Sequence, residues 1–272
     1  MKLSSFERNH WYGAACLLLF LWVTLPPGSA AAQTPDDSSA WSVRLGGGFI
    51  VSPDYTGSDD YETKPVPLID VSHPSGFFIR YPHGIGFNVI RREGLTAGVA
   101  VGYGGGRDND GDLAPLEEVD AGALANLFAD YRLGPVSIGV TLSSPVSGDT
   151  EGEQVSLGVR YRSMLTERLF YTAGAQLKWN SDDWNESLFS LTADEAARLG
   201  IAPFAAGGGA SEAGLGGTLT YAWTKRWSVT AVAGVSQLIG DAADSPIVED
   251  LGDATQLTGG LLLGYEFSGR HK

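Results

Sequence analysis

Cysteine is almost absent from the 272-residue sequence, in which Cys16 is the only one. Cys16 lies within an apolar segment near the amino terminus, and not after it, where a lipoprotein carries its lipidated cysteine. We expect this segment to be removed on export, which leaves a mature chain without thiols. Disulfides and cysteine nucleophiles are thereby excluded.

Long hydrophobic runs are also missing. No stretch after residue 40 approaches the roughly 20 consecutive apolar residues that a transmembrane helix needs. The strands of a transmembrane β-barrel would leave no such run, because their apolar residues alternate with polar ones. Positive charge is scarce as well: 18 Lys and Arg stand against 32 Asp and Glu, for a net charge of -14. A nucleic-acid partner is disfavoured, since such proteins usually carry basic patches.

Histidine is rare, and after residue 32 only His73, His83 and His271 remain. In the barrel topology that the strand pattern predicts below, we expect His73 in a short periplasmic turn and His83 in a link on the outer side. No Ser-His-Asp set can be assembled from them, and no G-x-S-x-G motif occurs, so we predict neither an enzyme nor a cofactor.

Three aspartates alternate at 108, 110 and 112, as in a calcium loop. The EF-hand pattern fails because Leu113 takes its glycine position and Val119 its final glutamate. We interpret this segment as a solvated outer loop and predict no metal site.

Residues 1–32 have the pattern of a secretory signal. Lys2 and Arg8 are followed by the apolar core Ala14–Val23, by Pro26-Pro27-Gly28, and by Ala30-Ala31-Ala32 as a small-residue cleavage site. The alternative, an uncleaved anchor, is disfavoured by the shortness of the core. We predict cleavage before Gln33, a polar lead-in over 33–40, a barrel over 41–268 and a tail over 269–272.

From Trp41 onward, apolar and small polar residues alternate with period two. Residues 213–223, for example, place Leu215, Leu219 and Tyr221 on one face and glycine and threonine on the other. A soluble sandwich would carry more charge on that second face, whereas small polar residues suit the interior of a barrel. Such alternation predicts twelve strands, at 41–51, 63–72, 76–82, 84–90, 94–103, 119–132, 135–144, 153–162, 168–179, 212–223, 226–237 and 256–267.

Connections between these segments alternate between short and long, apart from the link near His83. Bacterial outer-membrane barrels have an even strand number, short periplasmic turns and long outer loops. The sequence therefore predicts an all-β, antiparallel, up-and-down transmembrane barrel of about 12 strands (10–12) in the outer membrane. A short helix is expected at 190–200 in the longest loop, with Thr192 as N-cap, Glu195 in a capping box and Gly200 as C-cap. It could fold over or into the mouth, but an external flap is preferred.

Five charged residues fall on the face predicted to point into the lumen. In an open pore they would set ion preference, and in a plugged barrel they would form paired networks. The pattern does not choose between the two. These residues are Asp130, Arg160, Arg162, Lys178 and Glu266.

Three loop motifs resemble the MltA-interacting protein family, also called MipA/OmpV. They are Pro53-Asp-Tyr55-Thr-Gly57-Ser58-Asp59-Asp60-Tyr61, Gly102-Tyr-Gly104-Gly-Gly-Arg107 and Gly240-Asp241-Ala-Ala-Asp-Ser245-Pro246-Ile247-Val248. Glycines that permit positive φ and turn-capping aspartates also suit a structural role, and the first and third motifs lie at one predicted rim, where they could pack together.

The resemblance implies an outer-membrane protein in contact with lipid and lipopolysaccharide. For the family's namesake, it implies a scaffold that joins a lytic transglycosylase to a peptidoglycan synthase. Other members are described as porin-like or adhesive. Three hypotheses stay open at this point: a scaffold, a channel for small solutes and a surface adhesin.

Overall fold

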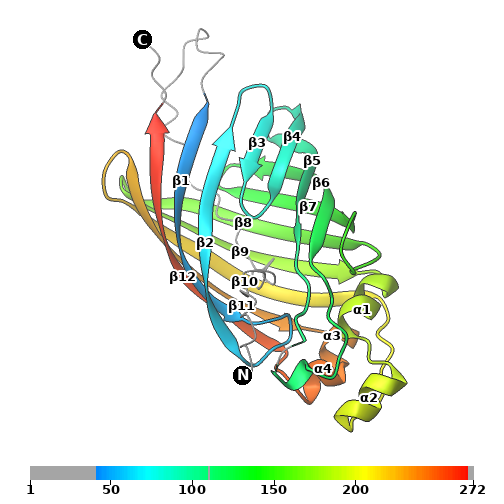
Figure 1. The fold of residues 1–272 in the computed structure, drawn as a ribbon. Helices are drawn as coiled ribbons and strands as arrows, with labels where there is room; N and C mark the ends of the chain where they lie inside the picture. Colours follow the sequence, from blue (N-terminus) through cyan, green and yellow to red (C-terminus); the bar gives the residue numbers. More distant parts are fainter. Residues whose placement is uncertain (1–40, 110, 269–272) are drawn as a thin grey trace, which may run out of the picture.

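The computed structural model describes residues 41–109 and 111–268. The predicted signal peptide, lead-in and tail lie outside the described residues. Within them, twelve antiparallel strands close into one barrel, in which β1 pairs with β12 on one side and β2 on the other. Figure 1 shows the strands tilted around the barrel, with the helices gathered at one end.

Each strand pairs with its neighbours in sequence, as the predicted up-and-down topology requires. The strands are β1 (Ser42–Pro53), β2 (Tyr61–Ser72), β3 (Phe77–Arg80), β4 (Gly84–Arg91), β5 (Leu95–Gly104), β6 (Gly122–Leu133), β7 (Val136–Pro145), β8 (Gln154–Thr166), β9 (Leu169–Asn180), β10 (Gly209–Ala222), β11 (Trp227–Leu238) and β12 (Thr255–Ser268). The barrel fold and the strand number are confirmed.

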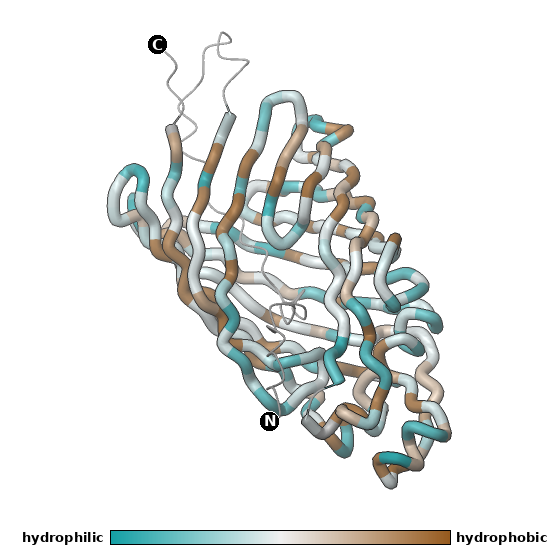
Figure 2. Tube along the Cα trace, in the orientation of Figure 1, coloured by the Kyte–Doolittle hydropathy of each residue, from teal (hydrophilic) through white to brown (hydrophobic). Residues whose placement is uncertain are grey.

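Large apolar side chains point outward from the strands, and many are exposed. Phe49 is 62% exposed, Leu261 63% and Leu215 61%, values that would be costly in water and are natural against lipid tails. Figure 2 shows the resulting alternation of hydrophobic and hydrophilic residues along the strands. Exposed aromatic residues near strand ends, among them Trp179, Tyr221 and Phe267, match the girdles of outer-membrane barrels.

Part of the barrel interior is filled by an apolar cluster. Ile50 on β1, Leu68 on β2, Val232 on β11 and Leu262 on β12 are all at most 7% exposed and pack together, with Val66 beside them. These residues fill the lumen along β11, β12, β1 and β2. The free space consequently lies against the other strands.

Pairing along β2 is uneven. Its whole length pairs with β1, but β3 pairs only with Asp70, Val71 and Ser72, followed by a hydrogen bond from the Tyr81 N–H to the Ile69 carbonyl. The structure records no ladder partner for Tyr61–Leu68 on this side among the described residues. Pro65 and Pro67 lie in this part, and proline, which has no N–H to donate, is typical of strand edges.

The short β3 differs from the predicted strand at 76–82. It ends at Arg80 because Tyr81, Pro82 and His83 turn directly into β4. This turn lies level with Ile69, well inside the span of β2, and His83 lines the internal cavity. The expectation that His83 occupies an outer link was therefore wrong.

The long connections carry α1 (Asp182–Phe189), α2 (Ala193–Leu199), α3 (Asp241–Asp244), α4 (Pro246–Glu249) and a 3-10 turn η1 (Gly111–Leu113). The predicted helix is α2: Thr192 is its N-cap, Glu195 closes a capping box and Gly200 ends it in the left-handed conformation. Sequence reasoning missed α1, which Ser181 caps. Among the described residues, none of the helices is long and apolar enough to cross a membrane.

Candidate functional site

A cavity of about 790 Å³ occupies the lumen beside the apolar cluster. It begins at short turns that carry His73, Arg91 and Arg92 and continues along the inner faces of β3 to β9. Its far end is at Gln154 and Lys178, below the long loops. By the rule for bacterial barrels, the short turns face the periplasm, so the cavity reaches the periplasmic end.

Three of the five predicted lumen charges line this cavity: Asp130, Arg160 and Lys178. Asp130 on β6 and Arg160 on β8 form an ion pair of 3.9 Å. β7 runs between them, with Gly139 in register with Asp130 and the small Ser137 in register with Arg160. Arg162 lies one inward position further along β8 and is within electrostatic reach of Arg160.

Glu266, the fifth predicted charge, pairs with Arg44. The two are register partners on β12 and β1, with 3.2 Å between Arg44 Nη2 and Glu266 Oε2. A similar pair joins Asp70 on β2 to Arg80 on β3, also at 3.2 Å. Sequence reasoning missed Arg44, Asp70 and Arg80, although each shares the parity of the inward small residues on its strand.

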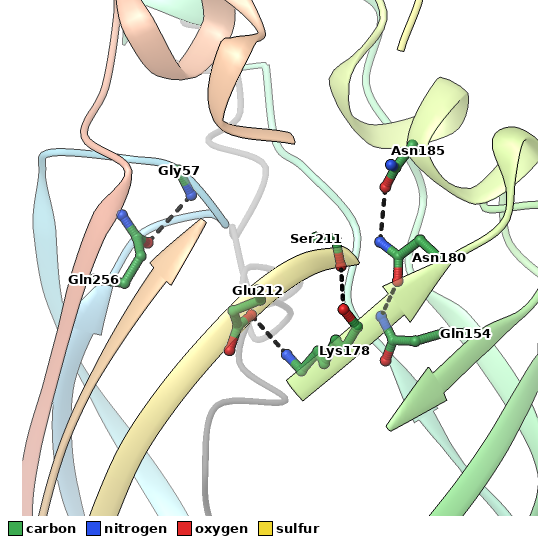
Figure 3. A network of polar contacts seen from close by, with 8 residues as sticks. All are labelled: Gly57, Gln154, Lys178, Asn180, Asn185, Ser211, Glu212 and Gln256. Carbon is green, nitrogen blue, oxygen red and sulfur yellow. Dashed lines mark hydrogen bonds and ion pairs between the residues drawn. The ribbon is translucent and has the colours of Figure 1, made fainter. Parts of the chain in front are cut away.

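At the far end of the cavity, Gln154 and Lys178 belong to a network of buried polar side chains. Figure 3 shows the contacts within this network. Lys178 Nζ lies 2.8 Å from Glu212 Oε2, and both residues are buried. Beside them, Gln154 donates to Asn180, which donates to Asn185 on α1, and Asn185 donates to the Gly207 carbonyl. The chain of bonds ties β8, β9, α1 and the segment before β10 together.

Above this network the long loops form a cap with its own apolar core. One cluster joins Leu113 and Leu116 from the β5–β6 loop, Leu191 and Ala196 from the β9–β10 loop and Ile247 from α4. All five are at most 3% exposed. The interpretation of the α2 loop as an external flap was wrong, because α2 packs against two other loops. Leu113 also shows that the β5–β6 loop is not simply solvated.

The first and third motifs pack against each other within this cap. The Gly57 N–H donates to Gln256, and its carbonyl accepts from the Asp253 N–H. Gly57 has φ of +101°, and a Cβ built there would lie 2.6 Å from Val248 Cγ2. The glycine is thus required both by its backbone conformation and by the proximity of α4.

The other residues of the first motif complete the connection between β1 and β2. Pro53 is buried and Tyr55 packs against the cap cluster. Ser58 accepts a hydrogen bond from the Asp60 N–H, while Asp59 and Asp60 are exposed. The Tyr61 hydroxyl accepts a hydrogen bond from the N–H of Leu257, which lies on β12.

The third motif builds α3 and α4. Gly240, with φ of +58°, precedes α3, and Asp241 accepts a hydrogen bond from the Gly207 N–H. Ser245 is fully buried: its hydroxyl donates to the Phe189 carbonyl and accepts from the Ile247 N–H. Pro246 occupies the first turn of α4, where its missing N–H costs nothing.

Arg107 of the second motif anchors the α1 loop. It is 6% exposed, and its guanidinium donates to the carbonyls of Leu188 and Glu117. Gly104 ends β5 beside Leu124, which leaves no room for a side chain. The three motifs therefore share one role in the structure, which is to hold the cap together.

Glu195 joins α2 to the β5–β6 loop. Burial opposes its ionisation, but the hydrogen bonds from Thr192 and from the Glu117 N–H, with Arg107 nearby, hold its pKa below the usual value. Glu195 is therefore a structural carboxylate. Within residues 41–109 and 111–268, no three His, Cys, Asp or Glu side chains come together as a metal site.

The sequence profile of the family described as "MltA-interacting protein MipA" matches residues 45–267. The chain belongs to the MipA family. This span contains all twelve strands in whole or in part and all three loop motifs. A search of curated proteins found no match.

Several solved outer-membrane proteins are similar to this MipA-family barrel in architecture. The NanC porin shares 8% identity over 84% of this chain and 100% of its own, with a TM-score of 0.39. OmpT of Vibrio cholerae shares 10% identity over 86% of this chain and 99% of its own, with a TM-score of 0.36. OccD1 (OprD) shares 12% identity over 75% of this chain and 56% of its own, also with a TM-score of 0.36. At these values the similarity is one of barrel architecture and says nothing of function.

Proposed function

We propose that this MipA-family barrel is a scaffold that recruits a lytic transglycosylase at the periplasmic face of the outer membrane. The observation that carries the proposal is the asymmetry of its two ends. The long loops pack into a cap with a buried core, whereas the cavity reaches the short turns. A barrel capped on the outside and accessible on the inside suits a partner in the periplasm.

The distribution of charge also favours a partner on the periplasmic side. The short turns and adjoining strand ends carry exposed basic residues, namely Arg91, Arg92, Arg132, Arg168, Lys225 and Arg226. The long loops hold most of the acidic excess. A periplasmic partner with an acidic surface would be attracted to the basic rim and steered towards it. The family description names the transglycosylase MltA as the partner of its namesake, and a protein of that class is the one proposed here.

Co-purification from a cell-envelope extract in mild non-ionic detergent tests the proposal. The tagged chain is expected to retain a lytic transglycosylase, and Arg91→Glu with Arg92→Glu to release it. Arg198→Glu is the matched control, because Arg198 is exposed on α2 at the opposite end. Absence of any transglycosylase, or equal loss with the Arg198 variant, would contradict the proposal.

The peptidoglycan synthase enters the proposal as a second partner held by the same complex. It should co-purify only when the transglycosylase is present. Retention of the synthase by a preparation that lacks the transglycosylase would mean that the barrel does not join the two enzymes in the proposed order.

A channel for small solutes is the second candidate, favoured by the size of the cavity. Ion conductance of the refolded chain in a planar bilayer separates the two. With the cap closed, we expect no unitary steps. Stable steps that change when Arg160 and Arg162 are replaced by glutamine would establish a channel instead. The adhesin hypothesis stays a prediction, to be tested by cell attachment after trimming of 180–211.

A further inference from the structure

The charge of the internal cavity is opposite to that of the chain. Acidic residues outnumber basic ones by 32 to 18 in the whole sequence. The cavity lining has six basic residues and one acid, Asp130. The basic residues are Arg80, Arg91, Arg92, Arg132, Arg160 and Lys178.

The deeper basic residues are held in place by carboxylates. Arg80 pairs with Asp70 at 3.2 Å, Arg160 with Asp130 at 3.9 Å and Lys178 with Glu212 at 2.8 Å. The structure records no ion pair for Arg91, Arg92 or Arg132 in the part of the chain that it describes. The mouth of the cavity therefore keeps a net positive charge, because Glu93 is the one acidic residue in the turn that carries Arg91 and Arg92.

Several of these charges act on one another. Asp130 is attracted to Arg160, Arg80 and Arg132, and Arg160 is repelled by Arg162, Arg80 and Arg132. Asp130 thus lies within the field of three guanidinium groups, of which Arg80 also pairs with Asp70. Low-dielectric walls focus such a field into the cavity, where it concentrates anions.

The wall beside these charges is aromatic. Phe78 and Phe128 meet edge to face with centroids 5.8 Å apart, and the Arg80 guanidinium lies 5.4 Å from the Phe78 ring centroid. Leu124 and Ala100 extend this apolar wall. The rest of the lining is mainly polar, so the cavity combines a small apolar wall with many polar groups. Its volume falls within the roughly 300–1,000 Å³ that is typical of small-molecule sites.

We propose that the cavity is a binding site for a small organic anion, with an acidic head group on an apolar body, that enters from the periplasmic end. Arg132, Arg91 and Arg92 attract the anion at the mouth. Arg80 and Arg160 bind its head group, with Asp130 as the competing carboxylate that the ligand replaces in part. The apolar body packs against Phe78 and Phe128.

Titration calorimetry on the chain purified in a neutral detergent tests this site. The probes are isophthalate, which has two carboxylates on a ring, inorganic phosphate, and benzyltrimethylammonium. Isophthalate is expected to bind, phosphate at least about tenfold more weakly, and the cation not at all. Equal binding of phosphate, or no isophthalate binding up to ~10 mM, would overturn the proposal.

Two variants change the affinity in opposite directions. Arg132→Gln should weaken isophthalate binding about threefold to tenfold, as loss of one charged partner predicts. Asp130→Asn should strengthen it by a similar factor, because the competing carboxylate is gone. The matched control is Arg168→Gln, which removes an exposed arginine from the same end but outside the cavity lining.

Arg132 is exposed, so its variant should fold normally, which heat-modifiable migration on a gel verifies. An equal effect of the Arg168 and Arg132 variants would show general electrostatic attraction to the rim and would refute the cavity site. Anion binding and transglycosylase docking can each be present without the other, so calorimetry and co-purification fail independently.

Discussion

Lys178 and Glu212 face each other as register partners across β9 and β10, with their charged atoms 2.8 Å apart and both side chains buried. Ser211 adds a hydrogen bond from its hydroxyl to the Lys178 carbonyl (Figure 3). An ion pair in this position is costly to break, because a lone buried charge has lost its hydration.

Glu212→Gln should therefore lower the free energy of unfolding by about 3–5 kcal/mol. The double variant Lys178→Met, Glu212→Leu removes both charges and should recover most of the loss. Thermal unfolding, followed by heat-modifiable gel migration, measures both. A double variant as unstable as the single one would mean that the pair itself, and not the uncompensated charge, provides the stability.

Gly57→Ala should loosen the cap. A residue with a side chain adopts the backbone conformation of Gly57 only at a cost of order 1–3 kcal/mol. The new Cβ would also collide with Val248. Gly200→Ala is the comparison, since Gly200 has φ of +74° but an open surrounding. Limited proteolysis of the long loops in intact cells should show faster cutting for the Gly57 variant. Equal rates would show that contact with Val248 contributes nothing.

Arg107→Met should open the outer end of the barrel. Its removal leaves the carbonyls of Leu188 and Glu117 without their donor inside the cap, at a cost of about 1–3 kcal/mol for each unsatisfied group. We expect bilayer conductance to appear in this variant while the parent stays silent. Arg198→Met, an exposed change on α2, should stay silent too. Silence of both variants would mean that the cap does not depend on Arg107.

Acid should weaken the attachment of α2. The pKa of Glu195 is lowered from its ordinary 4.5 in the folded protein, so its ionised form stabilises the cap fully above that pH. The contribution is lost as the pH falls below 4.5 through the folded pKa. Hydrogen exchange of α2, referenced to β10 in the same sample, should rise over this interval. Glu195→Gln should exchange faster at neutral pH and lose the pH step; a step that persists would assign it to another group.

The strands could be predicted because the lipid favours an apolar side chain at every outward position of a strand. Strand boundaries at β6 to β9 differ from the predicted ones by four residues at most, since the apolar face must continue through the membrane. α2 was predictable for a local reason: Thr192, Glu195 and Gly200 specify both of its ends within the segment itself. α1 carried a signal too, in Ser181 followed by Asp182 and Asp183, but it has no capping box and ends at Ser190 and not at a glycine.

What the sequence did not reveal depends on contacts between distant segments. Leu113, Leu191 and Ile247 lie in three separate loops of the sequence, and only the fold brings them into one core. Partners of the inward charges were missed for the same reason. Glu212 can be assigned to Lys178 only when the register of β9 and β10 is known.

The few residue pairs between β2 and β3 also affect how the barrel deforms. The seam where the chain closes on itself, β1 with β12, is paired from Ser42 to Val51, whereas β2 and β3 share three pairs. A cylinder under lateral load yields where its wall is joined least. The mechanical weak line of this barrel thus runs along the outer half of β2, beside Pro65 and Pro67, and any widening of the wall begins there and not at the closing seam.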